Sequence, residues 1–267
     1  MDYSLPLFGN NLRQTDINRL EKLQYRAAKV VTGALHYTSR EKLYIELGWE
    51  TITERFKFLG LCIFHKIHIQ ETRPLLRKCL TKLDLEKKNF LRSKGGYLPY
   101  PFLNKKFSNS FFPFISKIWN NLPNSTKSKN LLDFKAQMKI DIKPERHKHF
   151  SVGPKESNQL MTRFRTGRTN LNLDKFTLGQ LDEPNCMCHA KNESSEHFIM
   201  ECFIYTAERQ ILFNLVEYLV PNFPRLNKKQ KFQILIRGIN ISNPDFYTTN
   251  IRISLAVQSF ILKTKRF

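Results

Sequence analysis

The sequence lacks any apolar run of about eighteen residues, the length of a membrane-spanning helix. Its start, MDYSLPLFGNNLRQTD, lacks the basic and apolar segments of a signal peptide. These absences predict a protein without a membrane partner that works inside the cell, in the nucleus or the cytoplasm. Cysteine is scarce, with 5 residues in 267, and three of the five are clustered. That pattern suits a metal site in a reducing compartment better than a framework of disulfides.

Motifs of catalysis are missing as well. The sequence contains no glycine-rich phosphate loop and no G-x-S-x-G motif. It also has no adjacent pair of aspartates of the kind with which polymerases hold two Mg²⁺ ions. These absences weigh against an enzyme and favour a binding or structural role.

Acidic residues are few, with 23 Asp and Glu against 44 Lys and Arg, so the formal net charge is +21. Such a charge suits a polyanion, and RNA or DNA is the partner that it predicts. The excess is greatest from residue 73 to 106, and it recurs near residues 163–175. Tyr97, Tyr100, Phe102 and Phe107 lie among or beside the later cations of the first segment and could stack on bases. The candidate nucleic-acid-binding residues are Arg73, Arg77, Lys78, Lys87, Lys88, Arg92, Lys94, Lys105, Lys106, Arg163, Arg165 and Arg168. The alternative is a solvated basic loop whose aromatic side chains pack into the core.

One compact group of metal-ligand residues is present: Cys186, Cys188, His197 and Cys202. Thiolate and neutral imidazole are the ligands that Zn²⁺ takes in closed tetrahedral sites, and the gap after Cys188 lets the chain fold back. We therefore expect one structural Zn²⁺ per chain. Acidic residues surround the ligands, which favours a structural role over phosphate binding. Two alternatives remain open: His189 could replace His197, or the cysteines could simply surround a loop.

Apolar spacing predicts a mainly α fold. Capping-box spacing at Thr38/Glu41 and at Thr51/Glu54 marks two helix starts, and Gly33 and Gly48 mark two helix ends. His197 and Cys202 are too far apart to share one helix face, so a helix carrying His197 should end near Cys202. A short hairpin is expected at residues 186–188. The expected helices cover residues 17–31, 38–47, 52 to about 73, 111–119, 131–138, 157–166, 205–220, 228–238 and 249–263.

The segment KPERHKHFSVGP, rich in charge, histidine, glycine and proline, is the best domain boundary. We expect a helical domain over residues 1–143, a linker over 144–154 and a small helical zinc-binding domain over 155–267. The second domain should contain a buried stripe formed by Ile211, Leu212, Leu215, Val216 and Leu219. In the first domain, Trp119 should anchor the core.

Six blocks of the sequence resemble, in order, the region after the polymerase palm in reverse transcriptase polyproteins of non-LTR (LINE-type, jockey-like) retrotransposons. The blocks are LEKLQYRAAKVVTGA (20–34), LYIELGWETITERFKFL (43–59), SFFPFISKIWNNLP (110–123), LMTRFRTGRTNLN (160–172), CMCHAKNESSEHFIMEC (186–202) and FILKTKRF (260–267). Together they extend over nearly the whole chain.

The resemblance implies a thumb-like helical bundle followed by a C-terminal zinc-bearing region. In such elements this region helps to hold template RNA and target DNA during target-primed reverse transcription. The palm, with its paired catalytic aspartates, and the endonuclease would lie before this region. The family's RNA-directed DNA polymerase activity is therefore not expected in this chain, which we interpret as a fragment or remnant of a mobile element. The polymerase part of the same element is a further expected partner.

Overall fold

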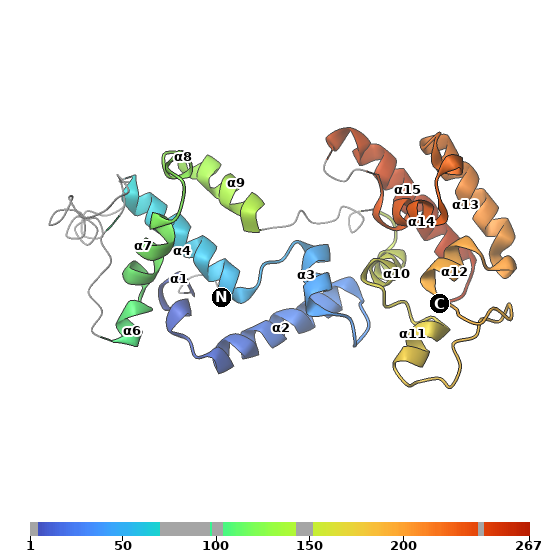
Figure 1. The fold of residues 1–267 in the computed structure, drawn as a ribbon, viewed down its shortest axis with the longest axis horizontal. Coiled ribbons are helices and arrows are strands. Elements are labelled where there is room, and N and C mark those ends of the chain that lie inside the picture. Colours follow the sequence, from blue (N-terminus) through green and yellow to red (C-terminus); the bar gives the residue numbers. More distant parts are fainter. Residues whose placement is uncertain (1–4, 70–96, 98–103, 143–151, 240–242) are drawn as a thin grey trace. The chain divides into compact units, whose positions relative to one another are not determined.

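The structure, a computed structural model, describes residues 5–69, 97, 104–142, 152–239 and 243–267 (Figure 1). Within these ranges the regular elements are helices and there is no strand, which confirms the mainly α fold. The hairpin expected at Cys186–Cys188 is absent, because a single turn forms there instead. No helix in the described part of the chain combines the length and the apolar character needed to cross a bilayer.

The chain forms two compact units. Unit 1 comprises Met1–Gln24 and Gly48–Glu145, and unit 2 comprises Tyr25–Leu47 and Arg146–Phe267. The expected linker lies mostly outside the described residues, but the first expected domain needs correction, because Tyr25–Leu47 belongs with the C-terminal part. One buried and one partly buried contact explain why: Arg165 Nε donates to the Glu46 carboxylate at 2.7 Å, and Arg163 Nε donates to the Gly33 carbonyl at 3.0 Å.

Unit 1 consists of short helices around one long one. Its elements are α1 (Leu5–Phe8), η1 (Gly9–Asn11), the first part of α2 (Gln14–Thr32), α4 (Ile52–His68), α6 (Lys105–Ser108), α7 (Phe111–Asn120), α8 (Asn124–Lys127) and α9 (Leu131–Ile142). The predicted capping box of α4 is confirmed: the Thr51 side chain accepts from the Glu54 backbone N–H, and Glu54 accepts from that of Thr51. Two of the four free N–H groups of the helix start are thereby satisfied.

The core of unit 1 lies where α4 packs against α7 and α9. Trp119 is fully buried there, as predicted, and the His65 ring stacks on Phe134 with ring centroids 4.2 Å apart. Tyr97 is buried too. Its hydroxyl lies 2.5 Å from His68 Nδ1, and its ring meets that of Phe64 edge to face. The base stacking expected of Tyr97 is therefore not possible, and its ring packs into the core as in the alternative.

Unit 2 contains the end of α2 and the remaining helices. They are α3 (Arg40–Leu47), α10 (Lys155–Thr166), α11 (Asn172–Thr177), α12 (Ser195–Met200), η3 (Phe203–Tyr205), α13 (Thr206–Leu219), η4 (Phe223–Arg225), α14 (Lys228–Arg237), η5 (Pro244–Phe246) and α15 (Tyr247–Lys263). Helices α13 and α15 run side by side, and α10 and α14 also pack on α15 (Figure 1).

The start of α3 departs from the prediction. The helix begins at Arg40, and Ser39, with its hydroxyl 3.5 Å from the Lys42 nitrogen, stands at the position of the cap. Thr38 is buried instead, and its hydroxyl has no hydrogen-bond partner among the described residues. The predicted ends at Gly33 and Gly48 are confirmed, since both glycines take the left-handed conformation that closes a helix.

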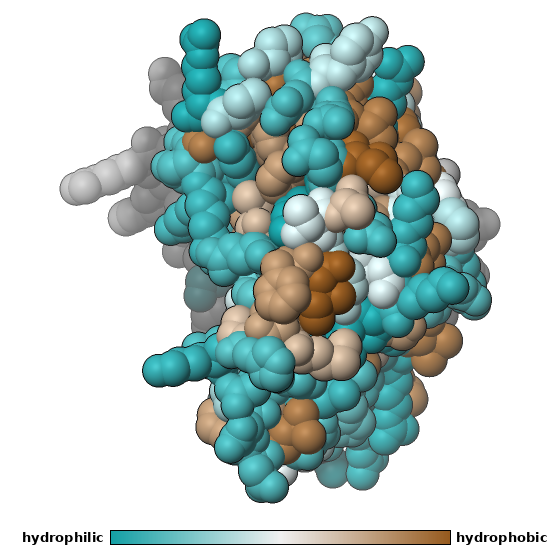
Figure 2. Space-filling model, turned by 90° about the vertical axis from the view of Figure 1, so that its right-hand side faces the viewer, coloured by the Kyte–Doolittle hydropathy of each residue, from teal (hydrophilic) through white to brown (hydrophobic). Residues whose placement is uncertain are grey.

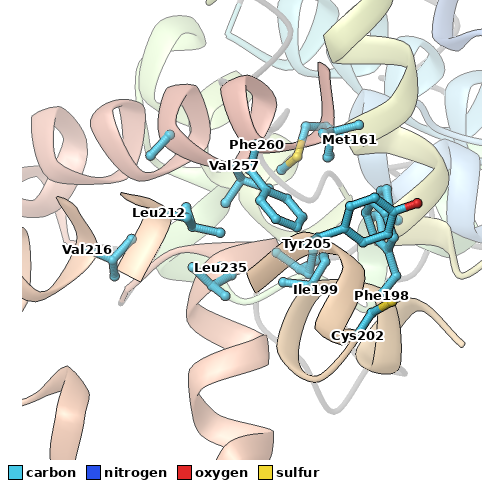
Figure 3. Packing of buried hydrophobic residues seen from close by; sticks show 14 of the residues in the cluster. Met161, Phe198, Ile199, Cys202, Tyr205, Leu212, Val216, Leu235, Val257 and Phe260 are labelled. Atoms are coloured by element: carbon cyan, nitrogen blue, oxygen red, sulfur yellow. The ribbon is translucent and has the colours of Figure 1, made fainter. Parts of the chain in front are cut away.

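The core of unit 2 gathers side chains from α10, α12, α13, α14 and α15 (Figure 3). Helix α13 contributes Leu212 and Val216, which are buried, whereas Ile211 and Leu215 are about half exposed. The predicted apolar stripe of α13 is therefore split: one edge faces the core and the other faces solvent. Cys202 lies in this core with Phe198 and Tyr205.

Candidate metal centre

The first two candidate ligands, Cys186 and Cys188, lie on one tight turn. The Cys186 N–H donates to the Ala190 carbonyl at 2.9 Å, and the His189 N–H donates to the Cys186 carbonyl at 2.9 Å. His189 takes a positive φ of 64°, which lets the chain reverse within these residues. Both thiols are buried as a result of the turn.

The other two ligands are placed by α12. Ser194 caps this short helix, and its hydroxyl accepts from the His197 N–H at 3.0 Å. The helix ends at Met200, as the spacing of His197 and Cys202 predicted. Cys202 then follows with its N–H bonded to the His197 carbonyl at 2.8 Å, and its own carbonyl accepts from Arg209 Nη1 at 2.8 Å. The turn after α12 thus fixes the backbone positions of His197 and Cys202.

The four ligand atoms of Cys186, Cys188, His197 and Cys202 all lie within 4.8 Å of one another, and all four residues are buried. The Cys186 and Cys202 sulfurs are 3.8 Å apart, and Cys188 Sγ is 3.2 Å from His197 Nε2. Two thiolates on one tetrahedral Zn²⁺ lie about 3.8 Å apart, and a thiolate and an imidazole nitrogen about 3.6 Å. The cluster can therefore hold a metal ion of this size.

The orientation of His197 suits metal binding. Nε2 points toward the thiols, and Nδ1 lies 3.6 Å from the Glu201 carboxylate. A carboxylate behind a ligand histidine fixes the ring and its tautomer. Glu201 in turn pairs with Lys228 at the start of α14, and this contact lowers the pKa of the Glu201 carboxyl. Lys228 also lies 3.4 Å from Glu196.

Glu193, which lies between Cys188 and the start of α12, binds residues on both sides of this segment in the sequence. Arg266 donates two hydrogen bonds to its carboxylate, from Nε at 2.7 Å and from Nη2 at 2.6 Å. The same carboxylate accepts from the Asn172 backbone N–H at 2.8 Å and lies 4.0 Å from the Cys186 sulfur. Glu193 is buried, and these partners satisfy its carboxylate oxygens. Lys228 and Arg266 together neutralise acidic groups that the sequence left without nearby cations.

The thiols differ in their acidity. Burial raises the pKa of Cys186 to about 12 and also raises that of Cys202. Burial acts in the same direction on Cys188, but hydrogen bonds from the Ala190 backbone and from the neighbouring thiols outweigh it and lower the pKa. A metal ion would have to displace protons from this set, because only thiolates bind it.

Of the two candidate histidines, only His197 joins the cluster. His189 is exposed on the turn, at the position where the backbone has positive φ. Its placement follows from its sequence neighbour: Cys188 already points into the cluster, so the next side chain points away.

Five of the candidate nucleic-acid-binding residues lie within the described part of the chain. Arg73, Arg77, Lys78, Lys87, Lys88, Arg92 and Lys94, with Tyr100 and Phe102, lie outside the described residues. Lys105 and Lys106 are exposed on α6, and Arg168 is partly exposed, with Nη1 3.9 Å from the Asp174 carboxylate. Arg165 requires a correction. It is buried, paired with Glu46 and bonded to the Ile236 carbonyl at 2.6 Å, so it stabilises unit 2 and cannot reach a phosphate.

Arg163 also has a structural bond. It is half-buried, and burial lowers its pKa. Its Nε donates to the Gly33 carbonyl at the end of α2. Sequence reasoning missed this use of arginine at helix ends, and it also missed Lys228 and Arg266 beside the metal cluster. Only the excess of acidic residues around the ligands signalled that cations from elsewhere were needed.

Comparisons of the chain with models of protein families, with curated proteins and with solved structures gave no match.

Proposed function

We propose that Cys186, Cys188, His197 and Cys202 hold one structural Zn²⁺ that clamps unit 2. The buried cluster of four ligand atoms carries this proposal. Three thiolates and one imidazole fill a tetrahedral shell, so no position is left for a substrate, and this ligand set favours zinc among divalent metals. The ion would tie the turn at residues 186–190 to the end of α12.

Metal analysis of the purified full chain tests the site. We expect one Zn²⁺ per chain, and its loss in Cys186→Ser and Cys202→Ser. Cys62→Ala is the matched control, because Cys62 is a buried thiol of unit 1 whose pKa burial raises to about 11. His197→Ala should lower zinc affinity sharply, whereas His189→Ala should keep full stoichiometry. Metal-free protein with an unchanged melting curve would contradict the proposal.

We further propose that the chain is a non-catalytic nucleic-acid-binding segment. Its net charge of +21 supports this, as do the exposed cations of α6, Lys105 and Lys106. RNA or DNA would be the main partner. The metal loop, residues 186–202, would contribute little to nucleic-acid binding, because its carboxylates compete with phosphate for the few cations beside them.

The resemblance to the post-palm region of non-LTR retrotransposon reverse transcriptases suggests where such a nucleic-acid-binding segment would act. Three of the resembling blocks meet at one carboxylate: Glu193 of 186–202 binds Asn172 of 160–172 and Arg266 of 260–267. These three blocks are thus parts of one folded unit. We therefore propose that this chain acts beside the polymerase part of such an element.

Salt dependence tests nucleic-acid binding. Changing Lys87, Lys88 and Arg92 together to Glu should weaken RNA and DNA binding regardless of sequence. It should also flatten the plot of log affinity against log salt by roughly 0.7–0.9 per lost phosphate contact. Lys191→Glu, in the metal loop, is the control and should change neither quantity. Unchanged affinity and slope in the triple variant would favour a solvated basic segment.

A zinc-stabilised protein-interaction domain is the second candidate function, and one observation favours it. Helix α13 exposes Ile211, Leu215 and Tyr218 at spacings of four and three residues, the stripe of a helix that packs on another. Figure 2 looks onto the side where α13 lies in Figure 1 and shows brown side chains among teal ones. Binding that persists at high salt would support this function over the first.

A further inference from the structure

Unit 1 has a groove on its surface. It lies along α7, beside α6 and the first half of α4, and has a volume of about 670 Å³. Such a volume lies within the range of small-ligand sites. Lysine, asparagine and apolar side chains line it.

The charge of the groove has one sign. Lys57, Lys105 and Lys117 line it, all three are exposed, and no aspartate or glutamate is among the lining residues. Three ammonium groups around one hollow repel each other unless an anion lies between them. The groove thus has the electrostatic character of a phosphate-binding channel.

The floor of the groove is apolar. Phe114 and Ile118 are one turn apart on α7 and are half-buried against the core of unit 1. Lys117 and Asn121 stand on the same face of this helix, next to that floor. An aromatic ring between cations is the arrangement in which a base stacks while the phosphates on either side pair with lysines.

Amide side chains complete the lining. Asn104 uses its oxygen to accept from the Phe107 N–H at 2.8 Å, which leaves its NH₂ group to donate. Asn109 and Asn121 add further groups that can donate and accept, as base edges require. An acidic peptide would use the lysines but would have no need of a planar apolar floor.

We propose that this groove binds a short stretch of single-stranded RNA or DNA, one base resting on Phe114 and the adjoining phosphates pairing with Lys57, Lys105 and Lys117. The inference rests on the proposed nucleic-acid-binding function and assigns that function a place in unit 1. The bases there would be unpaired, because a duplex hides their faces and could not stack on a side chain.

Fluorescence anisotropy of the full chain with a labelled ten-nucleotide oligouridylate tests the groove. Lys57→Ala/Lys117→Ala should weaken binding about tenfold and flatten the salt slope by about 1.4, because each phosphate contact on a single strand contributes about 0.7. Phe114→Leu should weaken binding by about fivefold or more with no change in slope. Lys22→Ala/Lys139→Ala removes two exposed lysines outside the groove and is the matched control.

The outcomes separate the two proposals. If the wild-type chain binds no nucleic acid, the proposed function fails and the groove fails with it. If the wild type binds and the groove variant matches the control, only the groove proposal is overturned. Lys57→Arg/Lys117→Arg should keep affinity and slope, which guards against a folding defect. If Lys57→Ala/Lys117→Ala loses the binding of a poly-glutamate peptide but keeps that of oligouridylate, the groove proposal is overturned in favour of an acidic protein partner.

Discussion

At the scale of single residues, an arginine in this basic chain can serve the fold or a partner, and burial separates the two roles. Arg165 and Glu46 both have nearly inaccessible side chains and lie 2.7 Å apart. Burial acts to lower the pKa of Arg165, and the Glu46 carboxylate opposes that effect. Removing one partner of such a pair leaves a charge buried without compensation. The sequence could not reveal this, because the two residues are far apart in the chain.

Arg165→Met should therefore destabilise unit 2 by about 3–5 kcal/mol, as breaking a buried ion pair does. The combined variant Arg165→Met/Glu46→Leu should recover part of this loss, because no charge is left unpaired. Arg168→Met, at a partly exposed and longer ion pair, should cost less than about 1 kcal/mol. Urea unfolding at constant zinc gives the three values. A stable Arg165→Met protein with weakened RNA binding would restore Arg165 to the nucleic-acid-binding residues.

At the scale of elements, local signals were predictable and distant ones were not. The Thr51/Glu54 capping box and the end of α12 near Cys202 are confirmed, because each depends on residues within one or two turns. The wrong cap of α3 involved two adjacent hydroxyls, Thr38 and Ser39, whose roles depend on the path of the chain. The exposed edge of α13 likewise depends on how far that helix is rotated about its axis where it packs on α15. The apolar periodicity of α13 alone does not determine this rotation.

The contact between the C-terminal segment and the metal loop gives a prediction at the same scale. Arg266→Ala removes both bonds to Glu193 and leaves a buried carboxylate 4.0 Å from the Cys186 sulfur. We expect zinc affinity to fall by about 10–100-fold, the usual effect of losing a residue that supports a ligand. Lys265→Ala, at the exposed neighbouring position, is the control. Zinc release to a coloured chelator measures both, and equal release rates would mean that Arg266 does not support the site.

At the scale of the whole molecule, metal binding should respond to pH. Burial keeps Cys186 protonated at neutral pH, with a pKa of about 12, and raises the pKa of Cys202 as well. Zinc binds thiolates, so each protonated thiol that it binds releases a proton, and binding strengthens as pH rises. Between pH 6.5 and 8 we expect apparent affinity to rise roughly a hundred- to a thousandfold per pH unit. Calorimetry in two buffers would show release of about two to three protons per Zn²⁺. Affinity independent of pH would mean that the thiols are already ionised before zinc binds.

The assignment of Tyr25–Leu47 to unit 2 has a consequence for synthesis on the ribosome. This segment leaves the ribosome early, yet its partners on α10 emerge only after all of unit 1 has been made. At roughly 5–20 residues per second, the delay lasts several seconds or more. During that time Leu43, Tyr44 and Leu47, which are buried in the finished fold, have no core to enter. A chaperone that holds apolar segments would meet the nascent chain here first, before the cysteines of the metal centre have been translated.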